Sequence, residues 1–307
     1  MTDRAPHITI ALCTHNGAAH LREQLDSYLA QSHENWRLWV SDDGSTDDTR
    51  AILKDFATRH GGPREIRIID GPNQGATANY ISLLCHPEFP AGAVALSDQD
   101  DVWLEDKLTR AVQGLAQSDA PLLYGAQSVL TDAALRPIGA SKPGPCPPGF
   151  GNALVQNIVS GHSAALNPSA LALVRRAGVP EHVPFHDWWL YQLITGAGGR
   201  VIIDPAQVLL YRQHRDNTVG ARHGLRAHMR RMHQVGAQQF KTWTSANTMA
   251  LKACEALLTP QARATLESFT QPRRGPARAL QLRALGVHRQ HPLATAGLYL
   301  AAMLGRV

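Results

Sequence analysis

The stretch Ala93–Lys107, AVALSDQDDVWLEDK, decides the fold. Its first residues, Ala93–Leu96, form a short apolar run that is typical of a buried β-strand. Immediately after Ser97 come three carboxylates, Asp98, Asp100 and Asp101. Ligands of open α/β sheets bind at the carboxyl ends of the strands. We therefore expect this strand to deliver its acids to a ligand site.

Three acids so close together repel one another, and a shared cation would relieve that repulsion. A divalent metal is the natural partner, because Mg²⁺ and Mn²⁺ prefer oxygen ligands and are commonly held by one or two carboxylates together with substrate phosphates. The alternative is a solvated acidic turn in front of a helix, since the first turn of a helix favours Asp and Glu. On this stretch alone both interpretations remain open.

Strands and helices alternate along the first part of the chain. Apolar runs at 7–14, 36–41 and 65–70 predict three earlier strands, each followed by a polar turn and a helical pattern. This alternation predicts an α/β fold with a mainly parallel sheet sandwiched by helices. The polar turns should then converge on one crevice. They contain Cys13 to Asn16, Asp42 to Asp43, Asn73 to Gly75 and Asp98 to Asp101.

Several common classes of protein are excluded by missing patterns. No turn carries GxGxxG or GxxxxGK[ST], which argues against the usual dinucleotide and P-loop modes of phosphate binding. The four cysteines have no metal-binding spacing, and we expect them to be reduced packing residues. No apolar run approaches the roughly 20 residues that span a bilayer, and the N-terminus lacks a signal-peptide pattern. A cytoplasmic location is expected.

Charge is unevenly distributed along the 307 residues, whose net charge is +5. Residues 1–220 contain 17 Lys and Arg against 23 Asp and Glu, whereas residues 221–307 contain 13 against 2. We expect a folded domain at 1–220, in which the chain changes character near residue 120. Residues 221–307 should form a basic amphipathic helical extension that faces something anionic, such as a membrane surface.

Six motifs in order resemble glycosyltransferase family 2, the nucleotide-sugar transferases of GT-A fold. They are CTHNG at 13–17, VSDDGSTDDT at 40–49, NQGATAN at 73–79, SDQDDVW at 97–103, HDWW at 186–189 and YRQHRDNTVG at 211–220. The resemblance covers roughly residues 7–217. It implies a catalytic domain at 1–220, with a nucleotide-sugar half at 1–120 and an acceptor half at 121–220. The wording of SDQDDVW, HDWW and YRQH looks most like the rhamnosyltransferase branch, which implies dTDP-rhamnose as donor.

The resemblance implies a set of residues that bind the nucleotide sugar. They are Cys13, His15, Asn16, Asp43, Asn73, Asn79, Asp98, Asp101, Trp188 and Arg212. The Asp43 carboxylate can accept the imide N–H of thymine or uracil, and Arg212 can pair with phosphate oxygens. His15 stands where the family usually has Tyr. The alternative is that Asp43, Asn73 and Asn79 only form turns, since Asp and Asn are common turn residues.

The sequence Asp98-Gln99-Asp100 resembles the family's DxD motif. In that interpretation Asp98 faces the ribose or sugar, and Asp101 supports it or contacts the sugar. Asp100, together with His214, would ligate the Mg²⁺ or Mn²⁺ that bridges the donor phosphates and neutralises the leaving group. A single histidine at a strand end is, however, often structural.

Asp187 in HDWW matches the family's catalytic acid, with His186 where Glu is more common. As a general base it would deprotonate the acceptor hydroxyl, and a single displacement would invert the anomeric carbon. The flanking tryptophans, among them Trp188, would partly dehydrate the carboxylate and offer a sugar platform. The alternative is an aspartate that caps a helix beside buried aromatic residues.

The motifs together predict an inverting, metal-dependent glycosyltransferase. It would move rhamnose from dTDP-rhamnose to a polysaccharide or a lipid-linked oligosaccharide, and the basic extension would hold it at the cytoplasmic face of the membrane. A UDP-sugar donor and an inactive module that binds sugar nucleotides or polysaccharides are the alternatives. No nucleic-acid partner is expected, because the tail carries no recognised reading motif.

Overall fold

The computed structural model describes residues 7–62, 64–213 and 237–305, which form two compact units. The first, the sheet unit, consists of the described parts of 1–143, 159–179 and 199–214. The second, the helical unit, consists of the described parts of 144–158, 180–198 and 215–307. Segments at 144–158 and 180–198 therefore belong with the C-terminal helices, although the chain visits the sheet unit between and after them.

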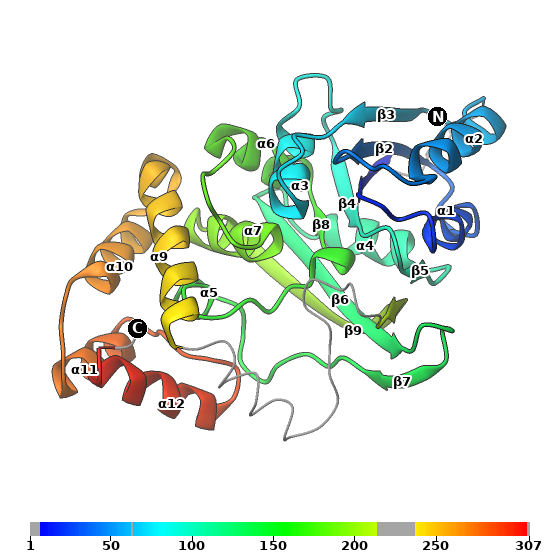
Figure 1. The fold of residues 1–307 in the computed structure, drawn as a ribbon. Coiled ribbons are helices and arrows are strands. Elements are labelled where there is room, and N and C mark those ends of the chain that lie inside the picture. The colour runs from blue at the N-terminus through cyan, green and yellow to red at the C-terminus, as the bar shows by residue number, and fades with distance from the viewer. Residues whose placement is uncertain (1–6, 63, 214–236, 306–307) are drawn as a thin grey trace. The chain divides into compact units, whose positions relative to one another are not determined.

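The sheet unit is built on one mixed sheet (Figure 1). Its strands are β1 (Ile8–Thr14), β2 (Trp36–Asp42), β3 (Ile66–Asp70), β4 (Ala93–Ser97), β5 (Val102–Trp103), β6 (Leu122–Thr131), β7 (Pro137–Ala140), β8 (Ala165–Leu166) and β9 (Arg200–Arg212). The order is β3-β2-β1-β4-β8-β6-β9-β5, with β7 paired to β6. The first four strands are parallel, as is the β6–β9 pair, whereas β8, β5 and β7 pair antiparallel.

Helices cover both faces of this sheet. They are α1 (Leu21–Leu29), α2 (Thr49–His60), α3 (Ala76–Cys85), α4 (Lys107–Leu115) and α6 (Pro168–Ala177), with a 3₁₀ turn, η1 (Gly161–Ser163). Alternate β1 residues, Ile8, Ile10 and Leu12, share one hydrophobic cluster with apolar residues of α1, α2 and α4. Helix α3 packs on β1 and β2 and contacts α6, so these two helices cover the other face.

Parallel pairing brings the carboxyl ends of the first four strands to one edge. Thr14 lies opposite Asp42, and Asp42 lies opposite Asp70. On the other side of β1, Leu12 lies opposite Ser97. The loops that follow these strands therefore start side by side. The α/β fold with helices on both faces is as the sequence predicts, while the later strands make the sheet mixed.

The helical unit has apolar packing of its own. It contains α5 (Phe150–Ala153), α7 (His186–Gly196), α9 (Ala237–Ala253), η2 (Glu255–Leu257), α10 (Pro260–Thr270), α11 (Pro276–Ala284) and α12 (Pro292–Met303). Trp188 of α7 stacks against Phe240 of α9 with ring centroids 6.4 Å apart, and Phe185 meets Trp243 edge-on at 5.0 Å. In the part of the chain that the structure describes, no helix has the length and apolar character needed to cross a bilayer.

Two local predictions can be compared directly with the structure. The apolar runs at 200–204 and 208–211 suggest two short strands, but they form the single strand β9, whose register against β6 shifts beside Gln127. The four cysteines are free thiols, as expected, and Cys13 is buried.

Asn167 joins the start of α6 to the preceding loop. Its Oδ1 accepts the N–H of Ala170, 2.8 Å away, which makes it the N-cap in front of Pro168. The same oxygen accepts from Leu122 N–H at 3.0 Å, and Nδ2 donates to two more carbonyl groups, those of Ser118 and Ala120. The side chain is 2% exposed, so these bonds are made away from water.

Replacing Asn167 by Ala should lower the free energy of unfolding by about 3 kcal/mol, because it removes a helix cap and three further hydrogen bonds of a buried side chain. Thr259→Ala is the matched control: that threonine caps α10 through one bond to Ala262 N–H and should cost about 1 kcal/mol. Urea unfolding followed by circular dichroism measures both. Equal losses would contradict the stabilising role of the extra bonds.

Candidate functional site

The loop after β4 is fastened to the loop after β1 by the side chain of Gln99. Its Oε1 accepts the backbone N–H of His15, and its Nε2 donates to the His15 carbonyl oxygen, both at 2.9 Å. This paired contact extends the β1–β4 association beyond the last strand residues. A Cβ on Gly17 would lie 2.2 Å from Gln99 Oε1, so the close approach needs glycine there.

Asp43, at the end of β2, organises the loop after β3. Its buried carboxylate accepts the backbone N–H of Asn73 at 2.6 Å and that of Gly75 at 2.7 Å. The Asp43 carbonyl oxygen also lies 2.9 Å from His15 Nδ1. A Cβ on Gly71 would lie 2.6 Å from the side chain of Asn79, so the loop packs tightly here. Asp43 therefore holds three loops together.

The two other asparagines at this edge bond within the protein. Asn79, 1% exposed, accepts from Ser41 Oγ at 2.5 Å and donates to the Ser41 carbonyl oxygen at 2.9 Å. Asn16 receives the N–H of Thr46 on its Oδ1 at 2.8 Å, and its own N–H donates to Ser45 Oγ. Asn79 is thus buried and stabilises the end of β2, whereas Asn16 is exposed.

Asp98 is the partly exposed acid closest to the end of β4. Its Oδ1 accepts the hydroxyl of Tyr80, from α3, at 2.7 Å. Burial, reinforced by the charge of Asp98, raises the pKa of Tyr80 well above its ordinary value, so the phenol stays a donor. Burial, with Asp98 and Asp43 nearby, likewise raises the pKa of the Cys13 thiol, which is therefore not a nucleophile here.

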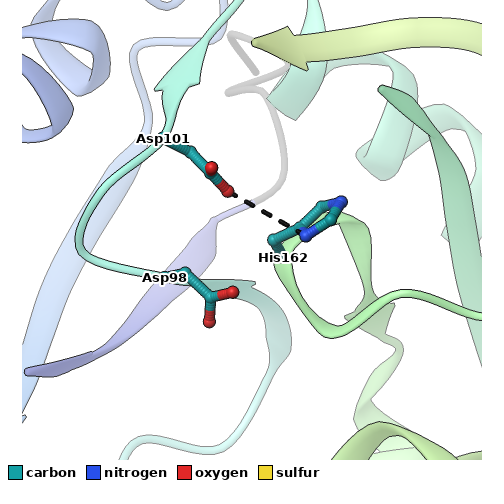
Figure 2. Close-up of side chains that lie close together, drawn as sticks. All are labelled: Asp98, Asp101 and His162. Carbon is teal, nitrogen blue, oxygen red and sulfur yellow. Dashed lines mark ion pairs between the residues drawn. The ribbon is translucent and has the colours of Figure 1, made fainter. Parts of the chain in front are cut away.

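Asp101, Lys107 and His162 form a buried polar group beside this acid. His162 Nδ1 lies 4.0 Å from Asp101 Oδ2, and the dashed line in Figure 2 marks this contact. Lys107 Nζ donates to the His162 carbonyl oxygen at 2.5 Å and lies 3.6 Å from the Trp103 ring centroid. Burial, and then the charges of Asp100 and Asp98, raise the pKa of Asp101 well above its usual range. A divalent cation would reverse that shift by favouring the ionised carboxylate.

Arg212, at the end of β9, ties down the acidic loop. Its backbone N–H donates to Asp101 Oδ1 at 3.3 Å, and its Nε donates to the Asp100 carbonyl oxygen at 3.0 Å. The remaining guanidinium nitrogens bond to the Ala133 carbonyl oxygen and to Glu23. With 3% of its surface exposed, this arginine positions the loop, and its guanidinium is already engaged by the protein.

A metal ion has one candidate site among the described residues. Asp98, Asp101 and His162 each offer one ligand atom, and these atoms lie within 4.8 Å of one another. The sequence instead suggests Asp100 and His214 as ligands. Asp100 lies in the same loop, partly exposed, while His214 falls outside the described residues.

Asp187 and Trp188 lie in the helical unit. Asp187 occupies the first turn of α7, is partly exposed, and its Oδ1 accepts the N–H of Trp188 at 2.7 Å. Trp188 is 4% exposed and its indole N–H donates to the Ala153 carbonyl oxygen at 2.7 Å. Trp188 thus packs α7 against α5, and because its side chain is buried its ring face is not open to solvent.

In the sheet unit, ten of the predicted residues lie at the carboxyl edge of the sheet or bond to the loops there. They are Cys13, His15, Asn16, Asp43, Asn73, Asn79, Asp98, Asp100, Asp101 and Arg212. The sequence analysis assigned no nucleotide- or metal-binding role to Gln99, Tyr80, Lys107 or His162. The sequence offered one signal for such a role, namely that the uncharged Gln99 stands among the acids of this loop.

Part of this chain matches a known protein family, and most of it is similar to a named transferase. Residues 9–132 match the family model described as "Glycosyl transferase family 2". The chain is 27% identical over 237 residues to dTDP-rhamnosyl transferase RfbG of Shigella flexneri, a match that covers 72% of this chain and 78% of that protein.

Two solved structures share the fold. Mannosyltransferase PcManGT from Pyrobaculum calidifontis, in complex with GDP-Man and Mn²⁺, has a TM-score of 0.54 at 21% identity and covers 99% of this chain and 87% of its own. Residues 1–349 of TarS from S. aureus, in complex with UDP-GlcNAc, have a TM-score of 0.53 at 14% identity, covering 97% and 92%. Both similarities concern the fold.

Substituting Arg212 by Lys should loosen the acidic loop, because lysine cannot reproduce the planar fork that bonds to Asp100, Ala133 and Glu23. We expect amide hydrogens of residues 98–101 to exchange roughly tenfold faster, as measured by hydrogen–deuterium exchange with mass spectrometry. The control is Arg136→Lys, at an exposed ion pair with Asp132. Unchanged exchange in Arg212→Lys would refute the positioning role.

Proposed function

We propose that this chain, whose residues 9–132 match the model of glycosyltransferase family 2, is a glycosyltransferase of GT-A fold that moves a sugar from a nucleoside diphosphate to a hydroxyl of a saccharide or lipid-linked acceptor. The observation that carries the proposal is the single edge at which β1, β2, β3 and β4 present their polar loops. Such an edge is where α/β sheets bind nucleotides.

The nucleotide would lie across the loops after β1 and β2. Cys13, His15, Asn16 and Asp43 border that space, and Asn73 follows on the next loop. Each carboxylate oxygen of Asp43 accepts one backbone N–H and has capacity for a second donor, such as the imide of a pyrimidine base. The buried Asn79 and Arg212 act in this proposal as supports that fix the loops, and Asp98 faces the ribose or sugar.

The diphosphate needs positive charge beside the acidic loop, and a divalent ion, Mg²⁺ or Mn²⁺, would supply it by neutralising the leaving group. The fit of this loop to a cation rests on its donors: two carboxylates and an imidazole gathered within 4.8 Å, one of them fully buried. The similar mannosyltransferase carries Mn²⁺ with its sugar nucleotide. The loop itself supplies orientation, because Arg212, Tyr80 and Gln99 hold it in place.

Asp187 is the proposed general base. It would take the proton of the acceptor hydroxyl as that oxygen bonds to the anomeric carbon, while the carbon–oxygen bond to the diphosphate breaks and its electron pair leaves with the diphosphate. One displacement of this kind inverts the configuration. The Trp188 side chain itself is buried, and its indole N–H bonds to the Ala153 carbonyl oxygen.

We propose dTDP-rhamnose as the donor and rhamnose as the sugar that is transferred, because the relative from Shigella flexneri is named a dTDP-rhamnosyl transferase. A UDP-sugar is the alternative, since TarS binds UDP-GlcNAc in the same fold. The two nucleotides differ in the thymine methyl group and in the 2′-hydroxyl of the ribose, so competition between dTDP and UDP in a donor-binding assay separates the two donors.

The substitution Asp187→Asn should lower the rate of sugar transfer by about 10²- to 10⁴-fold, because the amide cannot accept the hydroxyl proton. Donor affinity, measured by isothermal titration with dTDP, should change little. Glu181→Gln is the control, since Glu181 is exposed and precedes α7 in the same unit. Full turnover by the Asp187 variant would remove the aspartate from the role of base.

We also propose that the last two helices contact an anionic membrane surface. Leu293 and Leu300 of α12, together with Leu304 directly after it, recur at helical spacing and are 77%, 58% and 61% exposed. Exposed arginines lie close in sequence, at positions 273, 274 and 283. Exposed leucines can enter the acyl region of a bilayer, and arginines can contact its anionic headgroups. The inner leaflet offers both, and lipid-linked acceptors reside there.

The double substitution Leu293→Glu, Leu300→Glu should reduce binding to vesicles containing phosphatidylserine by at least about tenfold, because it removes apolar anchors and adds like charge. Co-sedimentation measures the bound fraction. Val179→Glu alters an exposed apolar residue of the sheet unit and should have no effect. If the wild-type protein binds neutral and anionic vesicles equally, the electrostatic part of the proposal is wrong.

A further inference from the structure

We propose that Arg289 is a binding site for a phosphate ester, and that this ester is the phosphate of a lipid-linked acceptor. The inference rests on the proposed function, because it names the group by which the acceptor is held while its hydroxyl meets Asp187. Both residues belong to the helical unit. Asp187 lies in the first turn of α7, and Arg289 lies in the connection between α11 and α12.

Arg289 is a partly buried cation, and no carboxylate within the described ranges pairs with it. Its Nε is buried and donates to none of the residues that the structure describes. Burial lowers the pKa of its guanidinium. In the sheet unit, by contrast, Arg110 pairs with Asp204 and the buried Arg212 pairs with Glu23. A cation withdrawn from water without a partner is costly, so the Arg289 guanidinium favours an anion that a ligand brings.

The backbone at Arg289 is held in place from two sides. Its N–H donates to Thr295 Oγ1, near the start of α12, and its carbonyl oxygen accepts from the same hydroxyl, both at 3.0 Å. On the other side, Gln290 bonds to the segment that precedes α7. Its N–H donates to Gln156 Oε1 at 2.7 Å, and its Oε1 accepts the N–H of Cys146 at 2.8 Å. The guanidinium therefore extends from an ordered backbone, which lowers the ordering cost of binding.

Aromatic side chains connect Arg289 with the proposed general base. The guanidinium lies over the ring of Phe240, 5.5 Å from its centroid, and Trp188 stacks against the same ring with centroids 6.4 Å apart. Both distances end at the Phe240 ring, so the Trp188 ring and the guanidinium are at most about 12 Å apart. Trp188 directly follows Asp187 in α7. A sugar with its phosphate ester is of comparable length, so one acceptor could reach both residues.

The surroundings of Arg289 suit a phosphate that is attached to a hydrocarbon chain. A guanidinium bonds to two phosphate oxygens at once. Residues 237–305 contain eight Lys and Arg against two Glu, so their positive potential favours an anion with more than one charge. The Arg289 backbone is bonded to the start of α12, where Leu293 is 77% exposed. An exposed leucine close to an anion site fits a ligand in which the phosphate is followed by an apolar chain.

The test measures binding of farnesyl diphosphate to the full chain by isothermal titration in EDTA, which removes divalent ions from the protein and the ligand. The wild-type protein should bind it more tightly than inorganic pyrophosphate, which has no hydrocarbon chain. Arg289→Gln should lower the affinity about tenfold or more, because the amide has neither the charge nor the fork of the guanidinium. Its affinity for dTDP with Mn²⁺ should stay unchanged. The control is Arg263→Gln, at an exposed arginine of α10 in the same unit, which should bind like the wild type.

Four results would overturn the assignment. They are no binding of farnesyl diphosphate to the wild-type protein, equal losses in the two variants, a loss of dTDP affinity in Arg289→Gln, or equal affinity for pyrophosphate, which would assign the site to soluble phosphates. Phenylglyoxal labelling of the wild-type protein decides the matter if the variant does not fold. Farnesyl diphosphate should protect Arg289 but not Arg263 from modification, and an unprotected Arg289 would refute the site.

Sugar transfer by the same proteins separates this inference from the proposed function. In Arg289→Gln the KM for a lipid-linked acceptor should rise about tenfold, while the KM for the nucleotide sugar stays the same. Binding of farnesyl diphosphate through Arg289 without any transfer by the wild-type protein refutes the proposed function alone. Transfer with an unchanged acceptor KM in the variant refutes the phosphate site alone.

Discussion

The repulsion among three carboxylates at the end of β4 is the constraint on which the rest of this site depends. The protein meets it by holding each part of the loop from a different element. Tyr80 donates to Asp98, the Gln99 amide pairs with the backbone of His15, and Arg212 bonds to both Asp100 and Asp101. The loop is therefore organised before any ligand arrives, which lowers the ordering cost of binding.

Polar side chains are held by other parts of the protein along the whole edge of the sheet. Polar residues that could contact a nucleotide bond first to neighbouring loops, as Asp43 does with the backbone of Asn73 and Gly75. Asn79 is committed entirely to Ser41. Asp98 is partly exposed, while buried groups such as Asn79 and Arg212 hold the loops in position. A substitution in the buried set therefore acts through position.

Much of the fold could be predicted from the sequence, but less of the site. The strand of Ala93–Ser97 is recognisable from its apolar run, and Asn167 with Pro168 marks the start of α6. Trp188 illustrates the opposite case, since a tryptophan beside a catalytic acid suggests a sugar platform, yet its ring is buried between helices. Burial depends on residues far away in the sequence, such as Phe240, and no local pattern reveals them.

The sequence by itself determined that strands and helices alternate and that each early strand ends in polar residues, because hydrophobic periodicity depends only on neighbours along the chain. It also determined that positive charge is concentrated after residue 220. Tertiary structure alone decided that Asp101 meets His162 and that 144–158 and 180–198 join the C-terminal helices. The reason is desolvation: a carboxylate becomes a metal-ligand candidate only when distant segments close around it and exclude water.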